Sequence, residues 1–268
     1  MGKNKKDSLG DRMKNNYEER SRVYLTRRTP VIIRLDGKSF HTFTRKLQKP
    51  HDAIFHDAMN DTLEFLCKNI QGCKFGYTQS DEITLVLTDY DTLTTDAWFD
   101  YQVQKMCSIA ASMATLEFNR SFEKNARPHL HRVKNCWTCS DDEHKYASAL
   151  EQCINGGAMF DARCFNIPVE EVTNCLLWRQ LDATRNAIQM LGQCNFSHKE
   201  LQGKSCNMIQ EMLWQQKQIN FNDMPTAFKR GVCCYRDTEG MWVIDLNCPI
   251  FSQDRNYIEK HIYITEGT

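Results

Sequence analysis

Val31-Ile32-Ile33-Arg34-Leu35-Asp36-Gly37 is the stretch from which the fold of this chain can be predicted. Its apolar and β-branched residues favour an extended backbone, and the dipeptide Asp-Gly is a strong turn signal. We therefore predict a β-strand over residues 31–36 that follows Thr29-Pro30 and ends in a turn. The carboxylate of Asp36 would then lie at the carboxyl end of this strand.

Downstream of this strand, hydrophobic periodicity predicts two helices and three further strands. The helices are expected over about 52–70 and 96–122, and the strands over 74–77, 82–87 and 159–165. The resulting order, β-α-β-β-α-β, is the ferredoxin-like arrangement of an α+β fold. It has a four-stranded antiparallel sheet with two helices on one face.

The part of the chain after Pro168 has a different pattern, and we treat 1–168 and 169–268 as two parts of one compact unit. Residues 125–157 show little periodicity and are predicted to be rich in loops. In the second part we expect additional helices and a small β-hairpin. The helices are predicted at about 169–191 and 205–217, and the hairpin strands near 232–236 and 242–246.

The predicted topology brings carboxylates together. The first and third strands of this arrangement are central antiparallel neighbours, so Asp36 should lie beside Asp81 and Glu82. Facing carboxylates repel one another unless a cation joins them, and Mg²⁺ prefers such oxygen ligands. Two Mg²⁺ ions can activate an attacking hydroxyl and stabilise a leaving phosphate.

The residues after Asp36 suit phosphate groups. Gly37 lets a ligand approach the backbone, and Lys38, Ser39, His41 and the amides of the turn can donate to phosphate oxygens. The alternative is that Asp-Gly and Ser-Asp are ordinary turn and cap residues. From the residues alone, both interpretations stay open.

Composition limits the other function classes. Lys and Arg number 34 and Asp and Glu number 34, which argues against a uniformly basic binder. Thirteen cysteines without a secretory leader predict a reducing, cytoplasmic compartment, and no apolar run is long enough to cross a membrane. Cys136 and Cys139 form a Cys-x-x-Cys pair, for which unligated thiols are the default and structural zinc the alternative.

Several spaced motifs resemble the tRNAHis guanylyltransferases and their Thg1-like relatives, over roughly residues 8–250. They are Arg34-Leu35-Asp36-Gly37-Lys38-Ser39-Phe40-His41-Thr42-Phe43, Tyr77-Thr78-Gln79-Ser80-Asp81-Glu82, Met159 to Pro168, Trp178-Arg179-Gln180-Leu181-Asp182-Ala183, Phe196 to Ser205, and Phe228-Lys229-Arg230-Gly231. The resemblance implies a polymerase-like catalytic palm within 1–168. Residues 169–268 would complete the nucleotide site and contact tRNA.

The family implied by this resemblance consists of 3′→5′ nucleotidyltransferases that extend the 5′ end of tRNA. A 5′ monophosphate is first adenylylated with ATP, and the 3′-hydroxyl of GTP or another NTP then displaces AMP. Two Mg²⁺ ions would be bound by Asp36, the carbonyl of Gly37 and Asp81, with Glu82 as a further catalytic acid. The triphosphate would lie along the turn from Asp36 to His41, and thus along Lys38, Ser39 and Phe40, and near Ser80.

One departure from the family pattern favours a repair role. Enzymes dedicated to tRNAHis carry His-Ile-Asn-Asn where this chain has Thr184-Arg185-Asn186-Ala187. The sequence is therefore more similar to the Thg1-like branch, which repairs truncated tRNA on the opposite strand as template. Asn186 is still expected to contact a triphosphate. The alternatives are G addition to tRNAHis and a different palm enzyme such as a nucleotide cyclase. A non-enzymatic RNA-binding module is disfavoured, because the first strand lacks the exposed aromatics such sheets use.

Local charge predicts where RNA would bind. Residues 75–104 contain six acids and no Lys or Arg, whereas the first 30 residues have nine bases against four acids. The C-terminal part also carries a basic excess, which a solvated helix face would share. With the resemblance, Lys204, Lys229 and Arg230 are predicted to contact tRNA, and Arg27 and Arg28 its 5′ end or NTP phosphates. The family also implies a homotetramer.

Overall fold

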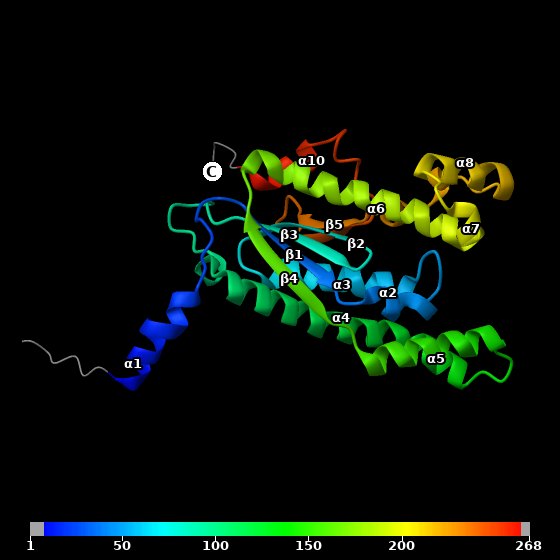
Figure 1. Ribbon diagram of the computed structural model, residues 1–268, viewed down its shortest axis with the longest axis horizontal. Coiled ribbons are helices and arrows are strands. Elements are labelled where there is room, and N and C mark those ends of the chain that lie inside the picture. Colours follow the sequence, from blue (N-terminus) through cyan, green and yellow to red (C-terminus); the bar gives the residue numbers. More distant parts are fainter. Residues whose placement is uncertain (1–7, 264–268) are drawn as a thin grey trace, which may run out of the picture.

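The computed structural model describes residues 8–263 of the chain. The start of the predicted basic segment, with Lys3, Lys5 and Lys6, lies outside the described residues. One antiparallel sheet of six strands, in the order β4-β1-β3-β2-β5-β6, forms the centre of the molecule (Figure 1). Its strands are β1 (Val31–Gly37), β2 (Cys73–Gln79), β3 (Glu82–Leu87), β4 (Phe160–Asn166), β5 (Val232–Arg236) and β6 (Trp242–Asp245).

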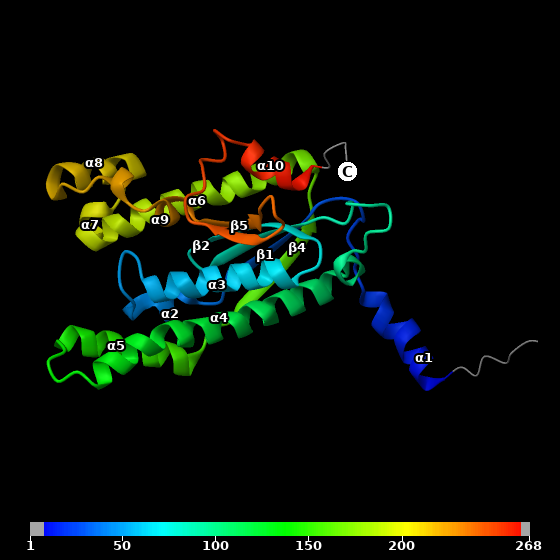
Figure 2. The ribbon, with the colours of Figure 1, turned by 180° about the vertical axis from the view of Figure 1, so that it is seen from behind.

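The predicted β-α-β-β-α-β order is confirmed as β1-α3-β2-β3-α4-β4, in which α3 is Ala53–Asn69 and α4 is Val103–Lys134. Both helices cover the same face of the sheet (Figure 2). Alternate residues of β1, namely Val31, Ile33 and Leu35, are fully buried in the core between that face and the two helices. Ile32 points to the other face and is equally buried. Burial on both faces explains why the strand is a continuous apolar run.

The C-terminal part adds to the same sheet and covers its second face. β5 pairs with β2, so the predicted hairpin extends the palm sheet. Helices α6 (Val172–Asn195) and α10 (Asn256–Ile262) pack on the face opposite α3 and α4. The far half of α6 forms a small core with α8 (Cys206–Lys217), next to the short helices α7 (His198–Leu201) and α9 (Thr226–Arg230).

Residues 125–157 were predicted to be rich in loops, and this prediction is wrong. Helix α4 continues to Lys134, and α5 (Asp141–Gly156) follows after a short connection. The start of α5 is fixed by a capping box in which the Ser140 hydroxyl accepts from the amide of Glu143 and the Glu143 carboxylate accepts from the amide of Ser140. Helix α4 also begins at Val103 rather than near residue 96, because a 3₁₀ turn with left-handed residues at Phe99 and Asp100 precedes it.

The remaining helices are short. They are α1 (Leu9–Met13), which lies away from the sheet, and α2 (Phe40–Phe43), which directly follows β1. Within the described part of the chain, no helix has both the length and the apolar character needed to cross a membrane.

Candidate active site

Three carboxylates stand in a row at the carboxyl end of β1. Asp36 is paired in register with Glu82 of β3 on one side and with Asp161 of β4 on the other. Directly opposed residues of neighbouring strands project from the same face of a sheet. Asp81 lies in the adjoining β2–β3 turn, where its carbonyl accepts a 3.1 Å hydrogen bond from the amide of Gly37. The chain therefore juxtaposes Asp36, Asp81 and Glu82 as the topology predicted.

The outer carboxylates have basic partners within the chain. Glu82 accepts hydrogen bonds of 2.8 and 3.1 Å from Arg179 on α6, and the Arg34 guanidinium lies 3.7 Å away. Asp161 forms a 2.9 Å ion pair with Arg163. Among residues 8–263, neither Asp36 nor Asp81 forms an ion pair of this kind.

The electrostatics of the unpaired carboxylates suit a cation. Burial raises the pKa of Asp81, and the negative charge of Asp36 raises it further. Two carboxylates beside a backbone carbonyl match the donors that Mg²⁺ uses when substrate phosphates and water complete its shell. Asp36, Asp81 and Gly37 thus fit the ion. In the part of the chain that the structure describes, no three His, Cys, Asp or Glu side chains gather in a metal-binding group, and this holds for Cys136 and Cys139 too.

The turn after β1 presents its backbone. A Cβ atom on Gly37 would lie 2.3 Å from the ring of Phe40, so only glycine permits this close packing. The Phe40 side chain is buried in the aromatic core, which leaves only its backbone for a nucleotide. Lys38, Ser39 and His41 are exposed. Ser39 and Ser80 both adopt left-handed φ values, +58° and +51°, and such backbone strain concentrates at functional sites.

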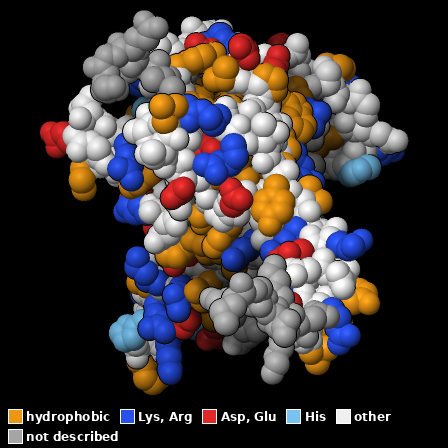
Figure 3. Space-filling view, turned by 90° about the vertical axis from the view of Figure 1, so that its left-hand side faces the viewer, with side chains coloured by type: hydrophobic (Ala, Val, Ile, Leu, Met, Phe, Trp, Pro, Cys, Tyr) orange, Lys and Arg blue, Asp and Glu red, His pale blue; other side chains and the backbone are white. Residues whose placement is uncertain are grey.

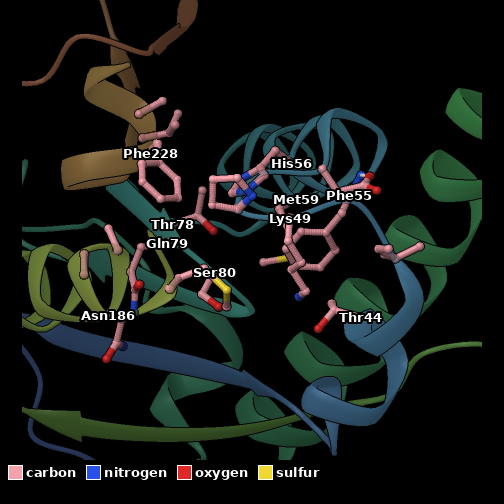
Figure 4. Close-up of a pocket in the computed structure, with 18 of the residues that line it drawn as sticks. Thr44, Lys49, Phe55, His56, Met59, Thr78, Gln79, Ser80, Asn186 and Phe228 are labelled. Carbon is pink, nitrogen blue, oxygen red and sulfur yellow. Dashed lines mark hydrogen bonds between the residues drawn. The ribbon is translucent and has the colours of Figure 1, made fainter. Parts of the chain in front are cut away.

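A cleft opens next to Ser80 and Asn186 (Figure 4). One wall comes from the β2–β3 turn, α6 and α9, with Gln79, Ser80, Asn186 and Phe228. The opposite wall comes from the segment after α2 and from α3. It includes Thr44, Gln48, Lys49, Phe55, His56 and Met59. Apolar rings and a few polar groups are what a nucleotide base requires.

The predicted RNA-binding residues lie in three separate places. Lys229 and Arg230 end α9 beside the cleft, where the Tyr77 hydroxyl donates to the Arg230 carbonyl at 2.6 Å. Lys204 lies between α7 and α8, at the far end of α6. Arg27 and Arg28 lie before the start of β1, whereas Asp36 lies at its carboxyl end.

The structure does not bring Arg27 and Arg28 to the carboxylate edge. The Arg27 guanidinium bonds to Asp89 at 2.6 Å and to Asp100 at 3.1 Å, and the Arg28 amide donates to Asp89. Figure 3 shows this end of the molecule, where Lys and Arg side chains are interspersed with Asp and Glu. These contacts give Arg27 a role in holding the loop between β3 and α4.

Sequence reasoning missed Asp161, Arg179 and the residues of the second cleft wall. The antiparallel pairing of β4 with β1 was the signal for Asp161, because Asp161 lies near the start of β4 and Asp36 near the end of β1. No pattern of spacing connects Arg179 with Glu82, 97 residues apart.

Two carboxylates without basic partners among residues 8–263, at a sheet edge beside a cleft of apolar rings and polar groups, fit the class of nucleotidyltransferases. The comparisons with known proteins agree with this class. Residues 10–168 match the family model for Thg1, tRNAHis guanylyltransferase, and the chain belongs to this family.

Relatives and solved structures extend the similarity beyond the matched region. An uncharacterised protein of Acanthamoeba polyphaga mimivirus is 30% identical over 84% of this chain and 76% of its own length. A probable tRNA(His) guanylyltransferase of Dictyostelium discoideum is 26% identical over 77% and 75% of the two chains. A bacterial tRNA(His) guanylyltransferase (Thg1)-like protein in complex with ATP is 38% identical, with a TM-score of 0.81 over 96% of this chain and 100% of that one. The same kind of protein in complex with GTP is 36% identical over the same shares of the two chains, with a TM-score of 0.72.

Proposed function

We propose that this nucleotidyltransferase repairs truncated tRNA by adding nucleotides to the 5′ end, with the opposite strand as template. The observation that carries the nucleotidyl transfer is the pair Asp36 and Asp81, which lack basic partners within residues 8–263 and adjoin the cleft containing Ser80 and Asn186. The repair role rests on Thr184-Arg185-Asn186-Ala187, which departs from the sequence of enzymes dedicated to tRNAHis. The similarity to a Thg1-like protein solved with ATP and with GTP supports these nucleotides as substrates.

Each substrate group has a candidate partner. Asp36, Asp81 and the Gly37 carbonyl would hold two Mg²⁺ ions, which supply charge stabilisation for phosphoryl transfer. Lys38, the backbone amides of Ser39, Phe40 and His41, and the Ser80 hydroxyl would donate to the triphosphate. Asn186 would contact the nucleotide from α6, with the base between Phe228 and the opposite wall.

The proposed reaction has two steps. The 5′ monophosphate of the RNA attacks the α-phosphate of ATP, the bond to pyrophosphate breaks, and an adenylylated 5′ end forms. The 3′-hydroxyl of the incoming NTP then gives up its proton and attacks the RNA 5′ phosphate, and AMP leaves. A 5′-triphosphate end enters at the second step, with pyrophosphate as the leaving group.

Glu82 takes a positioning role within this proposal. Its carboxylate is occupied by Arg179 and approached by Arg34, so it joins β3, β1 and α6 at the catalytic edge. Burial raises its pKa, which the two guanidinium groups counteract. Loss of Glu82 should therefore impair catalysis by shifting Asp36 and Asp81.

The decisive experiment is extension of 5′-truncated tRNAs at single-nucleotide resolution, with Mg²⁺, ATP and each NTP, while the opposite template base is varied. The expected result is addition of the complementary nucleotide, which Asp36→Ala and Asp81→Ala abolish. Addition that ignores the template base would overturn the repair role. Unchanged extension by both variants would overturn the site, and product from NTP without RNA would indicate a cyclase.

Addition of an untemplated G to tRNAHis is the second candidate. The match to the tRNAHis guanylyltransferase model favours it, whereas Thr184-Arg185-Asn186-Ala187 departs from the sequence of dedicated enzymes. Full-length tRNAHis that lacks the extra G distinguishes the two, because a repair enzyme should prefer truncated substrates.

The same proposal includes a homotetramer and a cytoplasmic location. The family resemblance supports the assembly, and thirteen cysteines that form no disulfide in the structure suit that compartment. Light scattering on the purified protein should give four times the chain mass of 31.3 kDa. A monomer mass at micromolar concentration would contradict the tetramer.

A further inference from the structure

We infer that a second anion site lies beside the catalytic edge and binds backbone phosphates of the RNA next to its 5′ end. The site is formed by Arg45 and Lys46, and Lys38 lies where it borders the proposed triphosphate site; all three belong to the segment 37–51, here called the arm. The inference rests on the proposed function, because it takes RNA as the second substrate.

The arm is the part of the chain that links the catalytic strand to α3. It carries Lys38, Arg45, Lys46 and Lys49 and no Asp or Glu, in a chain whose total charge is zero. The arm begins directly after Asp36, and the amide of Lys38 donates to the carbonyl of Met159 at 2.8 Å. This bond fixes the start of the arm against β4, so its cations have a defined place near the catalytic edge.

Three of these cations line one cleft of about 340 Å³ between the arm and the end of α5. The hydroxyls of Ser39 and Thr42 also line it, together with the small residues Gly156, Gly157 and Ala158. No acidic residue of the described chain lines this cleft. The Lys46 ammonium donates to the neutral amide oxygen of Gln152 at 3.0 Å.

The charges of these cations are uncompensated within the described residues. No ion pair within 4 Å joins Lys38, Arg45 or Lys46 to a carboxylate of residues 8–263. The neighbouring groove along α5 shows the contrast. There Arg132 pairs with Glu143 at 2.7 Å and Lys145 with Asp142 at 2.9 Å. Converging cations that lack carboxylate partners favour an external anion.

Arg45 and Lys46 distinguish this anion from the nucleotide, because Lys38 and Ser39, which also line the cleft, are the proposed donors to the triphosphate. The nucleotide cleft is lined by Thr44, Gln48 and Lys49 of the arm and by Ser80, and it shares no lining residue with the second cleft. The arm thus separates two clefts that both adjoin the end of β1. A reaction that joins two polyanions needs cations for each, and RNA phosphates are bound chiefly by Lys and Arg.

The test is RNA binding by the double variant Arg45→Gln/Lys46→Gln, in the otherwise intact protein. Both residues are exposed, so the melting temperature should stay unchanged. Fluorescence anisotropy with a 5′-monophosphorylated truncated tRNA should give affinity about tenfold weaker, with a salt slope shallower by about one to two. In extension assays, KM for the RNA should rise and KM for the NTP should not. Lys105→Gln/Lys124→Gln, two exposed lysines of α4, is the control with the same charge change.

The outcomes separate this inference from the proposed function. If wild-type protein extends tRNA and the double variant binds it as tightly, with the same salt slope, the second site is overturned and the function stands. A rise in KM for the NTP alone would also overturn it. If wild type binds RNA without extending it, while the double variant loses affinity, the site stands and the proposed activity falls. If the α4 control loses as much RNA affinity as the double variant, the loss follows from net charge alone and the second site is overturned.

Discussion

At the scale of single residues, Asp36 and Asp81 contribute negative charge that no basic side chain within residues 8–263 pairs with. We expect Asp36→Asn and Asp81→Asn each to lower the rate of nucleotide addition by about 10²–10³-fold, because several kcal/mol of charge stabilisation depends on a bound cation. Stability in the absence of Mg²⁺ should stay constant or rise, since one of two repelling charges is removed.

Single-turnover extension and thermal unfolding check this pair of expectations. Asp161→Asn is the matched control, because Asp161 also neighbours Asp36 but is neutralised by Arg163. If Asp161→Asn lowered the rate as much as Asp36→Asn, the rate would depend on the total negative charge at this edge and not on binding of a cation by Asp36.

Glu82 and Arg179 should behave as a buried pair. Their side chains are 13% and 7% exposed, and Arg179 also stacks on Trp178 with its guanidinium 3.6 Å from the ring centre. Removal of Arg179 leaves the buried Glu82 carboxylate with the 3.7 Å contact to Arg34 and without its hydrogen bonds to Arg179. Arg179→Met should therefore lower the free energy of unfolding, by less than the roughly 3–5 kcal/mol of a fully broken buried pair. The double variant Arg179→Met/Glu82→Gln should recover part of this loss.

Urea unfolding of the two single variants and the double variant forms a thermodynamic cycle. A positive coupling of at least about 1 kcal/mol is expected for groups in direct contact. Additive losses would show that the pair is not coupled and would contradict the positioning role of Glu82.

At the scale of elements, the hairpin of α4 and α5 depends on its cap. Ser140→Ala removes the acceptor for the Glu143 amide, and we expect it to lower the free energy of unfolding by about 1 kcal/mol. Hydrogen exchange should quicken in the first turn of α5 while α3 stays protected. Ser148→Ala, a substitution within the same helix, is the control. Unchanged exchange at residues 141–144 would contradict the role of the cap.

Hydrophobic patterns in the sequence predicted some elements at the correct residues and missed helix α5. The strands β3 and β5 lie at the predicted residues because their apolar runs are short and bounded by turn residues. Helix α5 was missed although its buried residues, among them Ala147, Leu150 and Cys153, recur at helical spacing, because the segment as a whole is less hydrophobic than α3. Its start is decided by one serine and one glutamate.

The candidate site divides in a similar way. Asp36 and Glu82 could be brought together from the sequence because strand order and register follow from the topology. The burial of Phe40 and the contact between Glu82 and Arg179 depend on tertiary packing between distant segments. Local spacing carries no information about such contacts.

At the scale of the whole molecule, a net charge of zero conceals segregated charges. Two of the six acids in residues 75–104, Asp81 and Glu82, lie at the start of β3, whereas the arm is free of acids. These two acids and the arm meet at the carboxyl end of β1, where a cation and phosphate groups would be bound together. A neutral protein can therefore bind a polyanion locally without a basic surface throughout.

Stability of the whole fold should fall as the pH falls below about 6.5, the ordinary pKa of histidine. Burial lowers the pKa of His56 to about 3 and that of His261 to about 4, so both stay neutral in the folded state. The unfolded chain binds these protons first, so the stability held by the neutral histidines is complete above pH 6.5 and is lost progressively down to about pH 4 for His261 and about pH 3 for His56.

His261 packs against the rings of Phe75 and Tyr235. The variant His261→Phe should keep this packing and show a shallower loss of unfolding free energy between pH 7 and 5 than wild type. His144→Phe, at an exposed position, is the control. Identical pH slopes for wild type and His261→Phe would show that His261 titrates alike in the folded and unfolded states.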